Sequence, residues 1–342
     1  MNQLTFNFDL PQQPKPETAP LTATPNAPAL EPMTQQLESI AQQLEQHPDY
    51  RVLRRLVPNL DHGPKVGAAA PSSVQDSAPW VLILDTETTG LSHATDKIIE
   101  LAMLLVQVDA ASGLPFGPVT TFEGFEDPGM PIPEVAGQIT GITDEMVRGQ
   151  RLADAQVQAL LARADLVVAH NAGFDRPFAE ARFLGFAGKR WACSFQDIDW
   201  KALGASSAKL SALAQDQGWF YDAHRALVDC HALLQVLSRP LPNRETTGLS
   251  QLMAAAAQPS FKLRAIGAPF EAKDKLKSRG YRWDAEARVW CATLASEHLL
   301  AAETPWLKAE VYGNRRAPVE VEALDSFTRY SRRPGTVDIQ SL

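Results

Sequence analysis

Two short runs of consecutive apolar residues, at 80–84 and 166–169, are the clearest pattern along the chain. Their length and their Val and Ile content predict strands that are buried on both faces. Further strands are expected at 98–108 and 117–125, and helices at 152–163, from Pro177 onward, at 206–217 and at 224–238. Because strands and helices alternate, this region predicts an α/β fold with a mixed sheet flanked by helices.

The flanking sequence divides into further segments by composition. Pro, Gln, Thr and Ala crowd the start of the chain, and apolar residues at helical spacing follow, interrupted at Pro48. We expect a disordered tail (1–33), a helical segment (34–58), a linker (59–78), the main domain (79–240), a second linker (241–258), a small basic and aromatic α+β domain (259–316) and a C-terminal tail (317–342).

Charge is distributed unevenly over the 342 residues, whose formal net charge is −8. Residues 76–240 hold 21 acidic against 12 basic side chains, whereas 259–316 hold 7 against 11. No apolar run is long enough to span a bilayer and no secretory signal is recognisable, so we expect no membrane association and a cytoplasmic location. The three cysteines have no spacing typical of zinc or of a disulfide framework.

Carboxylates follow both apolar runs. Asp85 and Glu87 lie two residues apart at the end of the first, so both project to one face, and Asp175 follows the second. His224 and Asp229 stand at the start of a predicted helix. Clustered carboxylates favour a hard divalent cation such as Mg²⁺ or Mn²⁺, and a histidine beside it can act as a general base. Taken singly, these residues also fit a turn, a helix cap and a surface histidine.

The three segments, in this order, resemble the motifs of the DEDDh 3′-to-5′ exonucleases, as in the proofreading epsilon subunit of bacterial DNA polymerase III. The resemblance covers about residues 79–240 and implies a ribonuclease H-like fold. It implies that Asp85, Glu87, Asp175 and Asp229 bind two Mg²⁺ or Mn²⁺ ions and that His224 activates the attacking water. The five-residue step from His224 to Asp229 matches the histidine subclass.

The same resemblance implies contacts to the substrate. The residues assigned to them are Thr88, Thr89, Leu91, His170, Asn171 and Phe174. One departure is Thr140, which stands where the family usually has a histidine in an Ile-His-Gly sequence. The implied partner is a single-stranded 3′ end, with DNA favoured over RNA. An RNA- or oligoribonucleotide-trimming enzyme and a non-catalytic accessory protein are the alternatives, and the second would be indicated by a missing acid.

The two ends of the chain carry weaker patterns. Gln3–Phe8 resembles the peptide by which proteins dock on the bacterial sliding clamp, although an apolar start to a disordered tail is the favoured explanation. In 259–316, basic residues alternate with Trp283, Trp290 and Trp306 around an expected hairpin at Asp284–Arg288. This pattern fits single-stranded nucleic-acid binding, but core packing is the expected role of at least two of the tryptophans.

Overall fold

The computed structural model describes residues 30–64, 78–242 and 244–342, which fall into two compact units, Met1–Val52 and Leu53–Leu342. In the first unit, α1 (Leu30–Glu45) exposes the apolar side chains of Leu37, Ile40 and Leu44. No helix among the described residues is both long and apolar enough to cross a membrane. The clamp-like sequence at Gln3–Phe8 lies outside the described residues.

The prediction of a helical segment over 34–58 is correct only for its first half. Helix α1 ends at Glu45, shortly before Pro48, whose ring cannot continue the helix. The second half is extended instead: Arg54 and Arg55 form β1 and pair in parallel with β7 (Trp219–Phe220). Pairing with a neighbouring strand here outweighs the local helical spacing.

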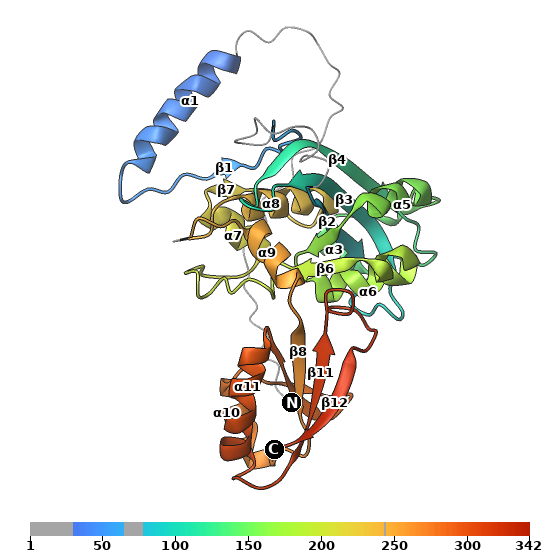
Figure 1. Cartoon of the computed structure of the whole chain (residues 1–342). Helices are drawn as coiled ribbons and strands as arrows, with labels where there is room; N and C mark the ends of the chain where they lie inside the picture. The colour runs from blue at the N-terminus through green and yellow to red at the C-terminus, as the bar shows by residue number, and fades with distance from the viewer. Residues whose placement is uncertain (1–29, 65–77, 243) are drawn as a thin grey trace. The chain divides into compact units, whose positions relative to one another are not determined.

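A five-stranded mixed sheet in the order β4-β3-β2-β5-β6 forms the centre of the second unit (Figure 1). Its strands are β2 (Trp80–Thr88), β3 (Ile98–Val108), β4 (Pro115–Phe125), β5 (Leu166–Ala169) and β6 (Arg190–Cys193). Strand β2 runs antiparallel to β3 and parallel to β5. The two apolar runs are therefore adjacent strands, and their carboxyl ends meet at one edge of the sheet.

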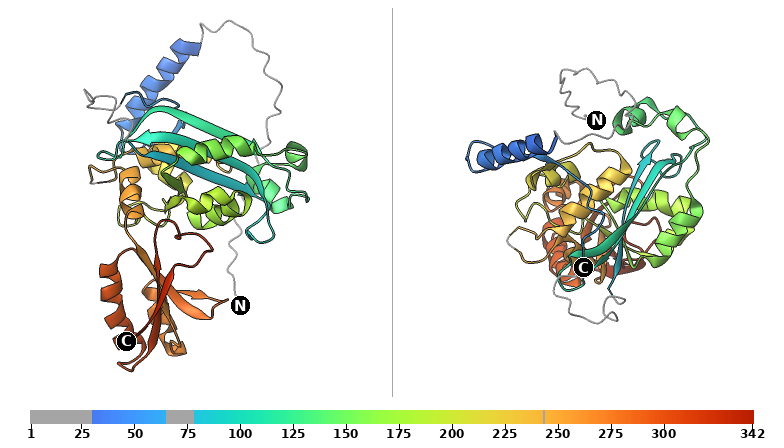
Figure 2. Two further views of the ribbon diagram at one scale, coloured as in Figure 1. Left: turned by 45° about the vertical axis from the view of Figure 1, so that its right-hand side comes forward. Right: turned by 90° about the horizontal axis from the view of Figure 1, so that it is seen from above.

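Helices cover both faces of this sheet, as Figure 2 shows for α8 (yellow) and for α5 and α6 (green). Alternate residues of β2 enter two different cores: Val81 and Ile83 pack with α8, whereas Leu82 and Leu84 pack with α5 and α6. Burial on both faces explains why the strand is continuously apolar. The predicted mixed sheet flanked by helices is confirmed. The helices of this region are α3 (Glu134–Thr140), α4 (Asp144–Val147), α5 (Asp154–Arg163), α6 (Ala172–Arg182), η1 (Leu184–Gly188), α7 (Leu210–Asp216), α8 (Ala226–Ser238) and α9 (Gly248–Ala256).

The C-terminal part contains a second sheet, antiparallel throughout, in the order β12-β11-β8-β10-β9. Its elements are β8 (Ser260–Ala265), η2 (Phe270–Ala272), α10 (Lys273–Ser278), β9 (Arg282–Asp284), β10 (Val289–Leu294), α11 (Glu297–Trp306), η3 (Leu307–Val311), β11 (Pro318–Leu324) and β12 (Thr336–Ser341). The expected hairpin is present. Trp290 and Trp306 pack in the core, whereas Trp283 is 51% exposed.

Two boundaries differ from the prediction. Residues 317–342 are not a tail, because β11 pairs with β8 and β12 pairs with β11. Val319 and Val321 of β11 enter the core of this sheet. The expected linker 241–258 contains α9, whose Leu249 and Leu252 pack into the same core as α8. Neither segment has a sequence pattern long or regular enough to predict its strands or helix, because each is stabilised by partners that are distant in sequence.

The loop between β11 and β12 is held by Arg176 of α6. This guanidinium is fully buried and donates to the backbone carbonyls of Ser326, Phe327 and Arg329. Its Nε donates to Glu180 at 2.7 Å. A buried charge is tolerated only when it is paired and fully hydrogen-bonded, and these contacts satisfy that requirement. Arg176 thus joins the C-terminal sheet's loop to the helix that carries Asp175.

Replacing Arg176 with Met should therefore lower the free energy of unfolding by about 3 kcal/mol, because the change removes the buried guanidinium's hydrogen bonds to three carbonyls and to Glu180. Urea denaturation of the purified chain measures this. Arg333→Ala is the matched control: Arg333 also donates to the Phe327 carbonyl and to Glu180 but is 44% exposed, and its loss should cost less than about 1 kcal/mol. Equal effects of the two changes would contradict the assigned role.

Candidate active site

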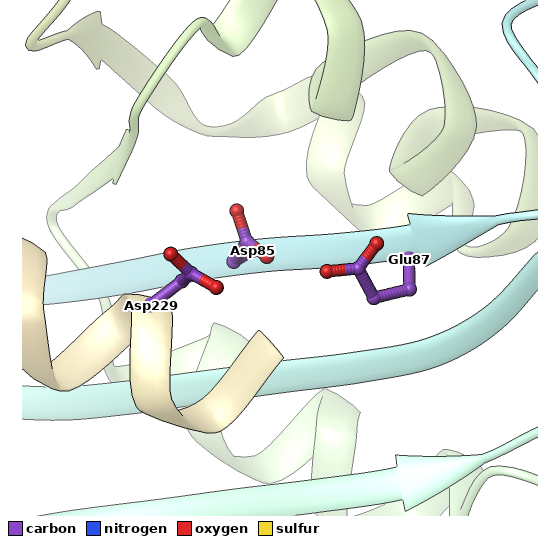
Figure 3. A group of neighbouring side chains, drawn as sticks. All are labelled: Asp85, Glu87 and Asp229. Carbon is purple, nitrogen blue, oxygen red and sulfur yellow. The ribbon is translucent and has the colours of Figure 1, made fainter. Parts of the chain in front are cut away.

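Three carboxylates converge where β2 ends beside α8. Asp85 and Glu87 project from β2 and Asp229 from the first turn of α8, as Figure 3 shows. Each offers an oxygen within 4.8 Å of the others, a spacing at which one cation can be shared. Asp85 faces the same side as Glu87 because successive strand residues alternate. This matches the arrangement expected from the sequence.

Asp175 approaches the same place from α6. Its Oδ1 accepts hydrogen bonds from the backbone N–H and the hydroxyl of Thr86, at 3.1 and 2.8 Å. These bonds tie α6 to the strand residue between Asp85 and Glu87, so the fourth carboxylate is held in a fixed position. Asn171 precedes α6 in the left-handed conformation (φ 70°), which asparagine tolerates better than most residues and which turns the chain sharply from β5 into the helix.

His224 lies two residues before α8, in the left-handed region at φ 69°. Its backbone N–H donates to Asp229 Oδ2 at 2.8 Å, and the Tyr221 hydroxyl donates to Oδ1 of the same carboxylate at 3.1 Å. The imidazole is exposed. Left-handed backbone is uncommon and costs energy for a residue other than glycine, and it accompanies functional sites more often than chance would give.

Electrostatic repulsion dominates this cluster. Burial raises the pKa of Asp85 well above its usual range, and the neighbouring Asp175, Asp229 and Glu87 raise it further. Burial, followed by repulsion from Asp229, raises the pKa of Glu87 to about 8. The pKa values of Asp175 and Asp229 are also raised, chiefly by burial. Without a counter-charge the site therefore favours protonated acids, and a bound cation would reverse this.

The cluster lines a cleft of about 560 Å³. Eight of the residues singled out in the sequence line the cleft: Asp85, Glu87, His170, Asn171, Phe174, Asp175, His224 and Asp229. Three of the expected substrate-contact residues do not line it. Thr88 donates to the Gly90 carbonyl, the Thr89 hydroxyl contacts Asp96, and Leu91 is 87% exposed. The first two have structural partners in the turn after β2.

His170 and Phe195 form one side of the cleft, with their rings packed edge to face at 5.7 Å. Burial lowers the pKa of His170 to about 4, so the ring is neutral at pH 7, and its Nδ1 lies 2.7 Å from Ser194 Oγ. His170 thus supports the exposed ring of Phe195, whose face is suited to stacking on a base.

Comparison with known proteins agrees with this geometry. Residues 82–237 match the family model described as exonuclease (RNase_T). These residues form an exonuclease-family domain. The relationship to proofreading-type exonucleases expected from the motifs is confirmed by relatives described as DNA polymerase III PolC-type. One relative, from Listeria welshimeri, is 37% identical over 103 residues, which cover 30% of this chain and 7% of the relative. Another, from Thermotoga maritima, is 30% identical over 180 residues, which cover 50% of this chain and 12% of the relative.

The chain thus spans about a tenth of the length of these relatives. Among solved structures, exonuclease X in complex with 5′-overhanging duplex DNA is 25% identical with a TM-score of 0.36, over 46% of this chain and 89% of that one. E. coli exonuclease I in complex with a dA16 oligonucleotide is 17% identical with a TM-score of 0.39, and the match covers 55% of this chain and 48% of that one.

The exonuclease domain also uses two residues that the motifs do not reveal. Glu100 of β3 is fully buried, accepts from Arg225 at 2.8 Å and accepts from the backbone N–H of Ala226 at 3.0 Å. It therefore fixes the start of α8, which carries Asp229. Tyr221 holds that carboxylate from the other side. A buried acid within an apolar strand was the available signal for Glu100, whereas nothing in the sequence around Tyr221 distinguishes it.

The donor set fits divalent metal ions. All four acids offer hard oxygen ligands, three of them share one position, and burial together with mutual repulsion raises their pKa values. No lysine or arginine forms an ion pair with Asp85, Glu87, Asp175 or Asp229 among the described residues. A pair of Mg²⁺ or Mn²⁺ ions would supply that missing charge.

This repulsion makes a stability prediction. In chelator, Asp85→Asn should raise the free energy of unfolding by about 1–3 kcal/mol, because it removes a partly buried acid from among like charges. Mg²⁺ should stabilise the wild type, by about 2.7 kcal/mol at a hundred times its dissociation constant, and should stabilise the variant much less. Thermal unfolding with and without Mg²⁺ measures both effects.

Asp222→Asn provides the control, since Asp222 is 84% exposed, pairs with Arg55 and lies outside the cleft. It should respond to Mg²⁺ as the wild type does. A wild-type protein that shows no Mg²⁺-dependent shift would overturn the metal assignment.

Proposed function

We propose that the exonuclease domain removes nucleoside 5′-monophosphates one at a time from the 3′ end of a nucleic acid. The observation that carries the proposal is the convergence of Asp85, Glu87, Asp175 and Asp229 beside His224 in one cleft of a domain from the exonuclease family. No acid of the expected set is missing, which disfavours a non-catalytic accessory role.

The residues have separate tasks in this proposal. The four carboxylates would hold two divalent cations, which would supply charge stabilisation at the reacting phosphodiester. His224, exposed at the cleft, accepts the proton of the attacking water. Asp175 and Asp229 are kept in place by Thr86, Tyr221 and the backbone N–H of His224. The ring faces of Phe174 and Phe195 contact the terminal bases.

We further propose DNA as the substrate, in repair or proofreading, and a cytoplasmic location. The support for DNA is that relatives of the domain occur within proteins described as DNA polymerase III PolC-type. RNA remains the alternative substrate, because discrimination depends on contacts to the 2′ position of the sugar. Docking on a sliding clamp through Gln3–Phe8 is a separate prediction, and a pull-down that compares the intact chain with one lacking residues 1–9 tests it.

Digestion of 5′-labelled single-stranded DNA, duplex DNA and RNA tests the activity. With Mg²⁺ the wild type should shorten single-stranded DNA from its 3′ end, faster than RNA, and chelator should stop it. Asp85→Ala and Asp229→Ala should each lower the rate by at least about a hundredfold, because each removes a ligand of the charge-stabilising ions.

Asp222→Ala serves as the control and should retain the wild-type rate, since that carboxylate is exposed and outside the cleft. Circular dichroism of all three variants shows whether they are folded. Folded Asp85→Ala and Asp229→Ala proteins that keep most of their Mg²⁺-dependent activity would refute the assignment.

A further inference from the structure

A second cavity, of about 490 Å³, adjoins the catalytic cleft. The two share one wall residue, Phe195, whose ring is 40% exposed. The exonuclease domain contributes Gln196 and Asp197, which follow Phe195 after β6. A polymer that leaves the catalytic cleft past Phe195 would therefore enter this cavity.

The opposite wall of the cavity belongs to the C-terminal sheet. Arg282 of β9 and Cys291 of β10 are cross-strand partners, and both line the cavity together with Thr293. The register places Arg264 of β8 next to Cys291, so Arg282 and Arg264 lie on the same face of the sheet. This face is the one opposite the core that contains Leu263 and Trp290.

The charges around the cavity are paired except for one. Asp197 accepts from Arg329 Nη1 at 3.3 Å and from the Tyr330 hydroxyl at 2.5 Å. On the sheet, Arg264 is engaged by Glu320 and Glu322. The Arg282 side chain is exposed and forms no ion pair within the described part of the chain. The cavity therefore presents one uncompensated positive charge, at Arg282.

Two of the residues that line the cavity also contain a buried polar atom with no hydrogen-bond partner within the described part of the chain. These atoms are Ser260 Oγ and Arg329 Nε, in residues that are only 3% and 5% exposed. Buried polar groups are nearly always hydrogen-bonded, so each unpaired one calls for an explanation. Neither atom is open to the cavity, so water enclosed in the wall, rather than a ligand in the cavity, would supply these partners. Apolar peptide is a poor occupant of a wall that offers Gln196, Thr293 and Arg282.

We propose that this cavity binds the single-stranded nucleic acid on the 5′ side of the 3′ terminus that occupies the catalytic cleft. Arg282 contacts a backbone phosphate, and Phe195 stacks on a base where the strand passes from one cavity into the other. The C-terminal sheet thereby extends the substrate track of the exonuclease domain. This inference rests on the proposed function, because the direction of the strand follows from the position of the 3′ end.

Binding of a 5′-fluorescein-labelled dT20 strand to the intact chain in chelator tests the proposal by fluorescence anisotropy. Arg282→Glu should raise the dissociation constant about tenfold at low salt and reduce the slope of its logarithm against log salt by about one. Arg288→Glu is the matched control: Arg288 lies in the turn of the same hairpin and outside the cavity, so it should change binding less than about twofold.

Turnover of a dinucleotide with Mg²⁺ separates this proposal from the exonuclease activity, because a dinucleotide has no phosphate beyond the one that is cleaved. Arg282→Glu should cleave it at the wild-type rate, which also shows that the variant is folded. The proposed binding of the strand in this cavity would be contradicted if Arg282→Glu bound dT20 with the wild-type dissociation constant. It would also be contradicted if Arg288→Glu raised that constant as much as Arg282→Glu does. A wild type that cleaves neither substrate while Arg282→Glu still binds dT20 more weakly would refute the exonuclease proposal and support the binding site.

Discussion

Four carboxylates crowd one end of β2 and repel one another: Asp175 is buried, and Asp85, Glu87 and Asp229 are partly buried in the cleft wall. Burial raises the pKa of Asp85, and the three other acids raise it further. Left alone, such a group lowers stability, so the surrounding fold must be rigid enough to hold it. The apolar sheet provides that rigidity, since β2 is buried on both faces and packs into two separate cores.

Two of the acids, and the helix that carries one of them, are also held by hydrogen bonds with neighbouring groups. Thr86 fixes Asp175, Tyr221 and the His224 backbone fix Asp229, and Glu100 fixes the start of α8. These groups do not reduce the repulsion; they prevent the carboxylates from moving apart to relieve it. Divalent cations bound among these acids would offset the repulsion, and metal binding would then be coupled to stability.

The sequence predicted the parts of this arrangement that are encoded locally. Continuous apolar runs gave β2 and β5, and the acids after them gave the cluster, because the carboxyl ends of adjacent parallel strands meet. Partners that are distant in sequence left no comparable local signal: Glu100, Tyr221 and the loop carbonyls bound by Arg176 become neighbours only after folding. For the same reason 317–342 was expected to be a tail, although β11 and β12 complete the second sheet. Thr88 and Thr89 were assigned to substrate by resemblance, whereas in the structure they hydrogen-bond within their own turn.

Anomalous diffraction from crystals of the intact wild-type chain grown with Mn²⁺ would locate the ions. We expect two strong peaks, about 4 Å apart, bounded by Asp85, Glu87, Asp175 and Asp229. Crystals saturated with Mn²⁺ that show no peak among these four side chains, or show the ions bound elsewhere, would contradict it.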